Sequence, residues 1–182
     1  CYRQMDYHPN VLIGHSVGGM MGMILTAEYL DEFKGLVLVD IAPFVSRGRA
    51  SRPPPPESFK DEVEARNWLK ERYPGFTAEY YDNRIRYAFT SKDGILKLKP
   101  RGSKISPGLA IDLWPYVEKI KTPLLLLVGK TSTTVSPETK KRMEDTVPDI
   151  KAIIVDGTGH MIPQDKPEEF EKLVRNFLKK VE

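Results

Sequence analysis

The feature that constrains this chain most is a glycine-flanked serine motif at residues 14–18, set between two apolar segments. Residues 10–14 are apolar and contain β-branched side chains, which is typical of a short buried strand. Residues 18–30 are apolar almost all round, as in a helix packed deep against a sheet. The connection between them is so short that the chain must bend sharply. We therefore expect Gly14 and Gly18 to be required, because a side chain there would strike the adjacent strand or helix.

The order of the predicted elements indicates the fold class. A second buried strand is predicted at residues 35–40, and strand, helix and strand in this order form a βαβ unit with parallel strands. Two more buried strands are predicted at 124–129 and 152–155, and a helix with apolar residues at spacings of three and four follows them. We predict that Asp165 caps this last helix, because Glu168 follows three residues later. The fold class is therefore α/β with a mostly parallel sheet.

The middle of the chain has a different composition. Four consecutive prolines at 53–56 form a stiff connector. Residues 58–73 and 77–89 are predicted helices, and the pair Asp93 and Gly94 indicates a turn into a short strand. We interpret this region as a mainly helical insert. The expected division is a first core part, the insert and a second core part, at 1–44, 45–120 and 121–182.

Ser16, at the centre of the motif, is the candidate nucleophile. A Gly-x-Ser-x-Gly turn between a buried strand and a helix lifts its serine above the edge of the sheet. The serine also lies at a helix N-terminus, where backbone N–H groups stabilise a developing negative charge. The N–H of Val17 is the expected first donor of such an oxyanion hole. A chance glycine-rich turn is the alternative, and the position between strand and helix argues against it.

His160 is the candidate general base among three histidines. His8 precedes the first predicted strand. His15 is adjacent to Ser16 and is expected to point away from it, in a packing or hydrogen-bonding role. His160 follows the last predicted strand in a glycine-bearing loop, and such a loop can carry an imidazole over a serine at the end of a neighbouring strand. The alternative for His160 is an ordinary surface histidine.

Asp40 is the candidate acid that would orient this base. It ends the strand next to the strand that leads to Ser16, so it projects from the same carboxyl edge of the sheet. The alternative is a strand-end aspartate that accepts hydrogen bonds from nearby backbone N–H groups. Ser132 could instead form a neutral hydrogen bond to His160, which would give a weaker triad.

Composition excludes several classes of function. The net charge of +3 includes no basic block of the kind that binds nucleic acid. The longest apolar run, at 124–128, is too short to cross a bilayer, and residues 1–6 lack the apolar stretch of a secretory signal. The single cysteine cannot form an internal disulfide, which fits a cytoplasmic location. Neither metal-ligand spacing nor a dinucleotide fingerprint is present, so we expect no cofactor and no metal.

Together these segments resemble the α/β-hydrolase superfamily over nearly the whole chain. The segments that carry the resemblance are residues 14–19, 36–43, 123–129 and 157–161. Within the superfamily the chain looks most like serine esterases with a helical cap, which implies a small-molecule ester or acyl substrate. Same-fold alternatives are a carbon–carbon bond hydrolase, an aminopeptidase, a thioesterase and a cofactor-free perhydrolase, and a non-catalytic binding module is the alternative from another class.

The resemblance also implies how the acid is placed. In this superfamily the acid commonly follows the strand at 124–129, where Ser132 stands in this chain. Asp40 falls where haloalkane dehalogenases and certain esterases have their acid. A dehalogenase is disfavoured because its nucleophile is an aspartate and Ser16 occupies that position.

The resemblance begins at the fifth strand of the superfamily, so family strands 5 to 8 are present. The first four strands, and the histidine–glycine loop that supplies the second oxyanion donor, have no counterpart. We therefore expect the strand before Ser16 to have an unpaired edge, which favours pairing with another segment. The expected partner is a second copy of the chain or a complementing N-terminal segment.

Four residues are candidates for the lining of a substrate pocket that the insert would cover. They are Trp68, Tyr81, Trp114 and Met161. For any one of the aromatic residues, packing inside the insert is the alternative.

Overall fold

The computed structural model describes residues 11–46, 53–100 and 110–181. The chain forms two compact units, a core unit of Cys1–Ser46 with Ala110–Glu182 and an insert unit of Arg47–Leu109. His8 and the segment around it lie outside the described residues. Within those residues, every helix is too short or too polar to cross a membrane.

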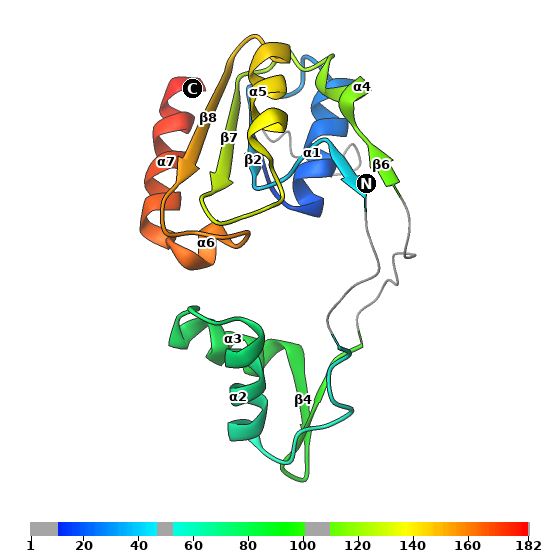
Figure 1. The fold of residues 1–182 in the computed structure, drawn as a ribbon, viewed down its shortest axis with the longest axis vertical. Helices are drawn as coiled ribbons and strands as arrows, with labels where there is room; N and C mark the ends of the chain where they lie inside the picture. The colour runs from blue at the N-terminus through cyan, green and yellow to red at the C-terminus, as the bar shows by residue number, and fades with distance from the viewer. Residues whose placement is uncertain (1–10, 47–52, 101–109, 182) are drawn as a thin grey trace. The chain divides into compact units, whose positions relative to one another are not determined.

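The core unit is built on a parallel sheet (Figure 1). Four strands pair in the order β1-β2-β7-β8, all parallel. Their bounds are Val11–His15 for β1, Gly35–Val39 for β2, Leu124–Gly129 for β7 and Ile150–Val155 for β8. The predicted α/β class with a mostly parallel sheet is therefore confirmed, and β1 lies at one edge of the described sheet.

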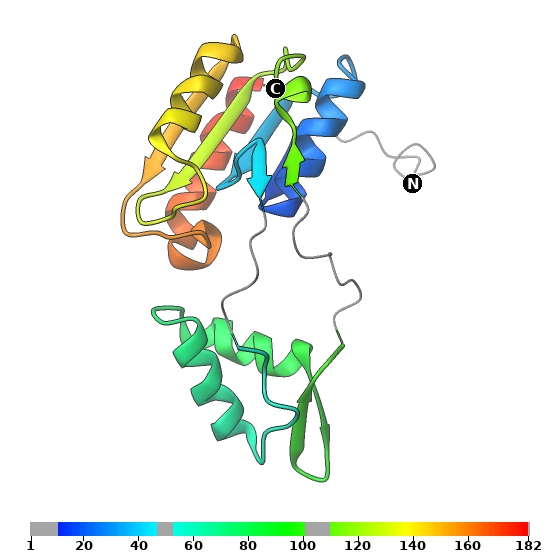
Figure 2. The same ribbon diagram turned by 45° about the vertical axis from the view of Figure 1, so that its right-hand side comes forward.

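Helices cover both faces of the sheet, as Figures 1 and 2 show. Leu36 and Leu38 pack on one face against the helices α1 and α4, whereas Val37 and Val39 pack on the other face against α7. This alternation is the two-residue period of a strand that is buried on both sides. The helices of the core unit are α1 (Val17–Glu28), α4 (Trp114–Val117), α5 (Pro137–Thr146), α6 (Ile162–Asp165) and α7 (Pro167–Val181).

The last helix does not begin as the sequence predicts. α6 ends at Asp165 and α7 begins at Pro167, so Asp165 closes one helix rather than capping the next. Its side chain accepts a hydrogen bond from the backbone N–H of Gly159 at 2.8 Å. The capping prediction is therefore wrong, because the carboxylate binds a loop that lies close only in the folded chain.

The insert unit has its own small core. Two helices, α2 (Glu62–Arg72) and α3 (Ala78–Ala88), pack with a hairpin of β4 (Phe89–Lys92) and β5 (Ile95–Leu98). Asp93 and Gly94 both have positive φ, at 52° and 80°, which suits a two-residue hairpin turn. Phe59, which precedes α2, joins buried residues of both helices and both strands in one cluster: Phe59, Ala65, Leu69, Tyr81, Phe89 and Leu96.

The insert unit is shorter than the insert predicted at 45–120. Phe44–Ser46 forms β3, which pairs antiparallel with β6 (Ala110–Asp112) in the core unit. Trp114 and Val117 of α4 belong to the same hydrophobic cluster as α1. Strands of three residues carry no readable periodicity, so the sequence gives no sign of this pairing.

Candidate active site

Ser16 lies at a sharp bend between β1 and α1. Its backbone has φ 53° and ψ −120°, a strained conformation for a residue with a side chain. Its N–H donates to Val39 O at 3.1 Å, and its carbonyl accepts from Gly19 N at 2.9 Å and Met20 N at 3.2 Å. The neighbouring strand and the helix therefore hold the bend from both sides.

The glycines at this bend have unequal roles. A Cβ on Gly14 would lie 2.5 Å from both Gly18 O and Gly19 N, which are backbone atoms that cannot move aside. A Cβ on Gly18 would meet nothing within 4 Å in the described part of the chain, so the predicted need for glycine there is wrong. The close approach occurs one residue later, where a Cβ on Gly19 would lie 2.5 Å from Ile41 Cγ2.

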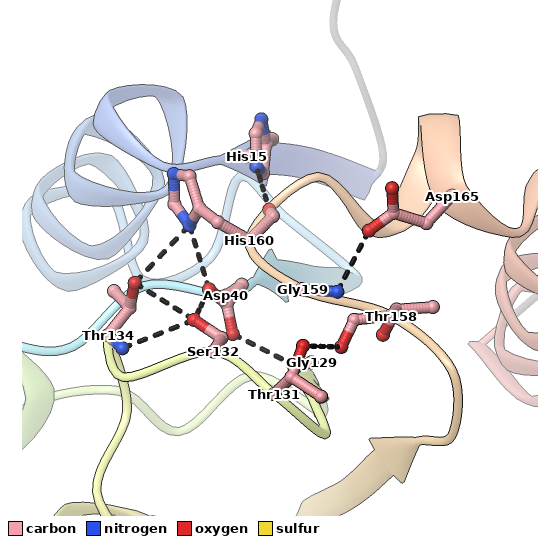
Figure 3. A network of polar contacts seen from close by, with 10 residues as sticks. All are labelled: His15, Asp40, Gly129, Thr131, Ser132, Thr134, Thr158, Gly159, His160 and Asp165. Atoms are coloured by element: carbon pink, nitrogen blue, oxygen red, sulfur yellow. Dashed lines mark hydrogen bonds and ion pairs between the residues drawn. The ribbon is translucent and has the colours of Figure 1, made fainter. Parts of the chain in front are cut away.

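Asp40 immediately follows β2, the neighbour of β1, with its side chain fully buried. Its φ of 48° is also positive. Oδ1 accepts a hydrogen bond from Gly129 N–H at 3.0 Å, and Oδ2 accepts one from the Ser132 hydroxyl at 2.5 Å. His160 Nδ1 also lies 2.7 Å from Oδ2 (Figure 3). The carboxylate thus has three donors and no exposed surface.

These donors decide the charge of Asp40. Burial alone would raise the pKa of the carboxyl group. Hydrogen bonds from His160, Ser132 and the Gly129 N–H outweigh burial and hold the pKa below its ordinary value of 3.8. Asp40 is therefore ionised at neutral pH, and a proton on Nδ1 of His160 faces a negative charge.

Backbone contacts hold the loop that carries His160. Thr158 Oγ1 donates to Val155 O at 2.8 Å, and Asp165 accepts from Gly159 N–H. A Cβ on Gly129 would collide with Gly159 O, so glycine is needed where the loop passes the end of β7. The loop is therefore fixed against both β7 and α6.

His15 connects this loop to the strand that leads to Ser16. Its Nε2 lies 2.7 Å from the backbone carbonyl of His160, which can only accept, so His15 donates through Nε2. The two imidazole rings lie 4.8 Å apart, centroid to centroid. The structure thus brings His160 beside the immediate neighbour of Ser16. Sequence reasoning expected a hydrogen-bonding role for His15 but not this partner.

Ser132 contacts the acid rather than the base. Its hydroxyl donates to Asp40, and Asp40 is the residue that reaches His160. Thr134, which sequence reasoning missed, also lies beside His160, with Oγ1 3.3 Å from Nδ1. The only sequence signal for Thr134 is its place in a run of hydroxyl residues at 131–134.

The remaining predicted site residues lie in different places. Val17 is the first residue of α1, where backbone N–H groups lack partners within the helix. Trp68 and Tyr81 pack in the cluster of the insert unit, and Trp114 is buried in the core unit. Met161 directly follows His160. Among the described residues, no group of three or more histidines, cysteines and acids is arranged to hold a metal ion.

Comparison with known proteins decides the family. The model of the alpha/beta hydrolase family matches residues 2–173. The chain belongs to this family. This confirms the resemblance, and hydrolases, esterases and lipases are among its relatives.

Curated alpha/beta hydrolase relatives match most of the chain. It is 26% identical over 182 residues to 2-(acetamidomethylene)succinate hydrolase of Mesorhizobium japonicum, covering 92% of this chain and 63% of that protein. It is 29% identical over 191 residues to the sn-1-specific diacylglycerol lipase of Mus musculus, covering 96% of this chain and 61% of the lipase. The chain thus spans less than two thirds of the length of these relatives.

Solved structures support the alpha/beta hydrolase fold. The structure of E-2-(acetamidomethylene)succinate hydrolase matches with a TM-score of 0.77 and 22% identity, over 98% of this chain and 69% of that chain. An esterase from Mycobacterium tuberculosis matches with a TM-score of 0.71 and 20% identity, over 92% of this chain and 59% of that chain. At these identities the similarity concerns the fold alone.

Proposed function

We propose that this chain carries the catalytic residues of a serine hydrolase that cleaves carboxylic esters or related acyl substrates. The observation that supports it most is the pairing of His160 Nδ1 with the buried, ionised Asp40 at 2.7 Å. The hydrogen bond from His15 supports it further, because it holds His160 beside the residue that precedes Ser16.

The proposed reaction proceeds through an acyl-enzyme. Ser16 Oγ attacks the carbonyl carbon while its proton moves to Nε2 of His160, and Asp40 stabilises the imidazolium that forms. The N–H of Val17 donates to the oxyanion. His160 then protonates the leaving alcohol, and a water molecule repeats the sequence to release the acid and restore Ser16.

The insert unit is proposed to act as a cap that selects the substrate. Trp68, Tyr81, Trp114 and Met161 remain candidates for contact with a small-molecule substrate. Pairing of the β1 edge with a second copy or a complementing segment also remains a proposal, since β1 has one strand neighbour among the described residues.

Cleavage of an acyl–nitrogen bond is a second candidate. It is favoured by a relative, the N-formylmaleamate deformylase of Pseudomonas putida, which is 26% identical over 95% of this chain. The same serine, histidine and aspartate would serve this reaction, with an amine as the leaving group. Parallel assays of an ester and the matching amide separate the two candidates by the ratio of their kcat/KM values.

A fluorophosphonate probe tests the nucleophile. The probe should label the chain, and Ser16→Ala should abolish labelling because Ser16 Oγ is the proposed nucleophile. Ser91→Ala, which alters an exposed serine of β4, is the matched control and should label normally. Persistent labelling of Ser16→Ala would refute the assignment, and absence of labelling in the unmodified chain would favour a non-catalytic binding module.

A further inference from the structure

A group of hydroxyl residues lies behind the proposed histidine–aspartate pair, and the reaction outlined above does not use it. Ser132 Oγ lies 2.5 Å from Asp40 Oδ2 and 3.1 Å from Thr134 Oγ1, and Thr134 Oγ1 lies 3.3 Å from His160 Nδ1. With the bond from His160 to Asp40, the four side chains form a closed ring of polar contacts (Figure 3).

The number of protons available shows that Ser132 donates its hydroxyl proton to Asp40. The backbone N–H of Thr134 donates to Ser132 Oγ at 3.2 Å, so the serine oxygen acts as an acceptor on that side. A serine hydroxyl has one proton to donate, and an ionised carboxylate has none. The shortest contact of Ser132 is the one to Asp40, so its proton lies on that contact.

The same count of protons determines the direction in which the Thr134 hydroxyl donates. Since the proton of Ser132 is directed at Asp40, the hydroxyl of Thr134 donates to Ser132 Oγ and turns a lone pair toward His160 Nδ1. His160 Nδ1 then faces two acceptors, the carboxylate of Asp40 and the oxygen of Thr134. Both acceptors favour the tautomer of His160 in which Nδ1 carries the proton and Nε2 can accept one.

We propose that Ser132 is a positioning residue that holds the carboxylate of Asp40 in place for His160. This inference rests on the proposed hydrolase function. Ser132 and His160 bind the same oxygen of Asp40, so removal of the serine hydroxyl frees one side of that oxygen. The carboxylate has no exposed surface, so loss of this donor leaves part of a buried charge without a hydrogen bond. Without the Ser132 hydroxyl, the carboxylate of Asp40 is held less firmly and its negative charge is less well stabilised.

The test compares variants that remove or keep the hydroxyl. Ser132→Ala should lower kcat by roughly tenfold, the ratio expected when a hydrogen bond to a charged group is lost, and should leave KM nearly unchanged. Ser132→Thr keeps the hydroxyl and should retain most of the activity. Thr133→Val removes an exposed hydroxyl from the same loop and serves as the matched control, with no change expected.

The titration of Asp40 distinguishes positioning from a general structural effect. The carboxyl signal of Asp40, followed by carbon NMR, should titrate at higher pH in Ser132→Ala than in the unmodified chain, because one of its donors is lost. Ser132→Thr and Thr133→Val should leave this titration curve unchanged.

The outcomes separate this inference from the proposed function. If the unmodified chain does not hydrolyse substrate but the titration of Asp40 moves in Ser132→Ala, the function fails and the positioning role stands. If the chain is active and Ser132→Ala changes neither the titration nor kcat, the positioning role is overturned. Should Ser132→Ala fail to fold, Ser132→Cys is measured instead, and its weakly donating thiol should give a smaller change in the same direction.

Discussion

Ser16 and Asp40 share an uncommon backbone property. Both have positive φ, at 53° and 48°, although each has a Cβ. Each immediately follows one of two adjacent parallel strands, which pair in register up to His15 and Val39. Such a conformation costs on the order of 1–3 kcal/mol per residue and persists only where the surroundings enforce it. The strain therefore falls on the two residues that the proposed reaction needs at this edge of the sheet.

Catalysis by the Asp40→Asn variant should be severely impaired, because the N–H of Gly129 determines how the new amide is oriented. The N–H of Gly129 can only donate, so the side-chain oxygen of an Asp40→Asn variant must face it, as Oδ1 does now. The NH₂ group is then directed at Ser132 and His160, and it forces the proton of His160 onto Nε2. An imidazole with its proton on Nε2 cannot accept the proton of Ser16.

We therefore expect kcat of Asp40→Asn to fall by about 10⁴-fold, the size of effect that the wrong tautomer causes in serine proteases. Nitrogen NMR of His160 should show the proton on Nε2 in this variant and on Nδ1 in the unmodified chain. Turnover within tenfold of the unmodified chain would exclude Asp40 as the acid.

The lowered pKa of Asp40 also predicts how stability depends on pH. Because the folded state binds the proton of this group less tightly than the unfolded state, ionised Asp40 stabilises the fold. This contribution is fully present well above the ordinary pKa of 3.8 and is lost as pH falls below it. In urea titrations, the stability difference between the unmodified chain and Asp40→Asn should shrink as pH falls below 3.8. A difference that stays constant from neutral to acid pH would contradict this linkage.

The polar contacts of the site show the limit of sequence reasoning for single residues. Ser16, His160 and Asp40 could be proposed from their places at the ends of strands and in a glycine-bearing loop. The partners of Ser132, Thr134, His15 and Asp165 depend on which loops meet, and this follows from the order of the strands in space. A hydroxyl or a carboxylate in a loop carries no periodic pattern that would give its partner.

At the scale of elements, two glycines of one motif should respond differently to the same substitution. In Gly14→Ala the added methyl group meets backbone atoms of Gly18 and Gly19 at 2.5 Å, where neither β1 nor α1 can yield cheaply. We expect a loss of about 1–3 kcal/mol or more in the free energy of unfolding, as for other overpacked sites. Gly18→Ala is the matched control.

Gly18→Ala adds the same methyl group four residues later, where nothing lies within 4 Å among the described residues. Alanine also favours helix over glycine, so stability should be unchanged or slightly higher. Urea unfolding of both variants measures the difference. Equal losses in the two variants would show that the bend does not depend on the close approach at Gly14.

Long elements were predicted well from the sequence, whereas the three-residue strands β3 and β6 were not. Buried strands such as β2 and β7 are continuous apolar runs, and the spacing of apolar residues in α7 is clear over 15 residues. β3 and β6 have three residues each, too few for any period to be read. Their pairing explains why the core unit extends to Ser46 and resumes at Ala110.

At the scale of the whole molecule, charge is divided unevenly between the two units. Of the 28 basic and 25 acidic residues, the insert unit, Arg47–Leu109, holds 14 Lys and Arg against 8 Asp and Glu. The core unit holds the other 14 basic and 17 acidic residues. A proposed cap with an excess of positive charge should attract anionic substrates over distances longer than a contact, and added salt should weaken this attraction.

Two esters that differ only by a carboxylate far from the ester bond can be used to measure this attraction. The kcat/KM of the anionic ester should exceed that of the neutral ester at low salt. This excess should fall severalfold as ionic strength rises from about 0.01 M to 1 M, because the screening length shortens from about 30 Å to about 3 Å over this range. The neutral ester is the internal control, because salt affects its kcat/KM only through the enzyme itself. If both esters respond equally to salt, the charge of the insert unit plays no part in substrate capture.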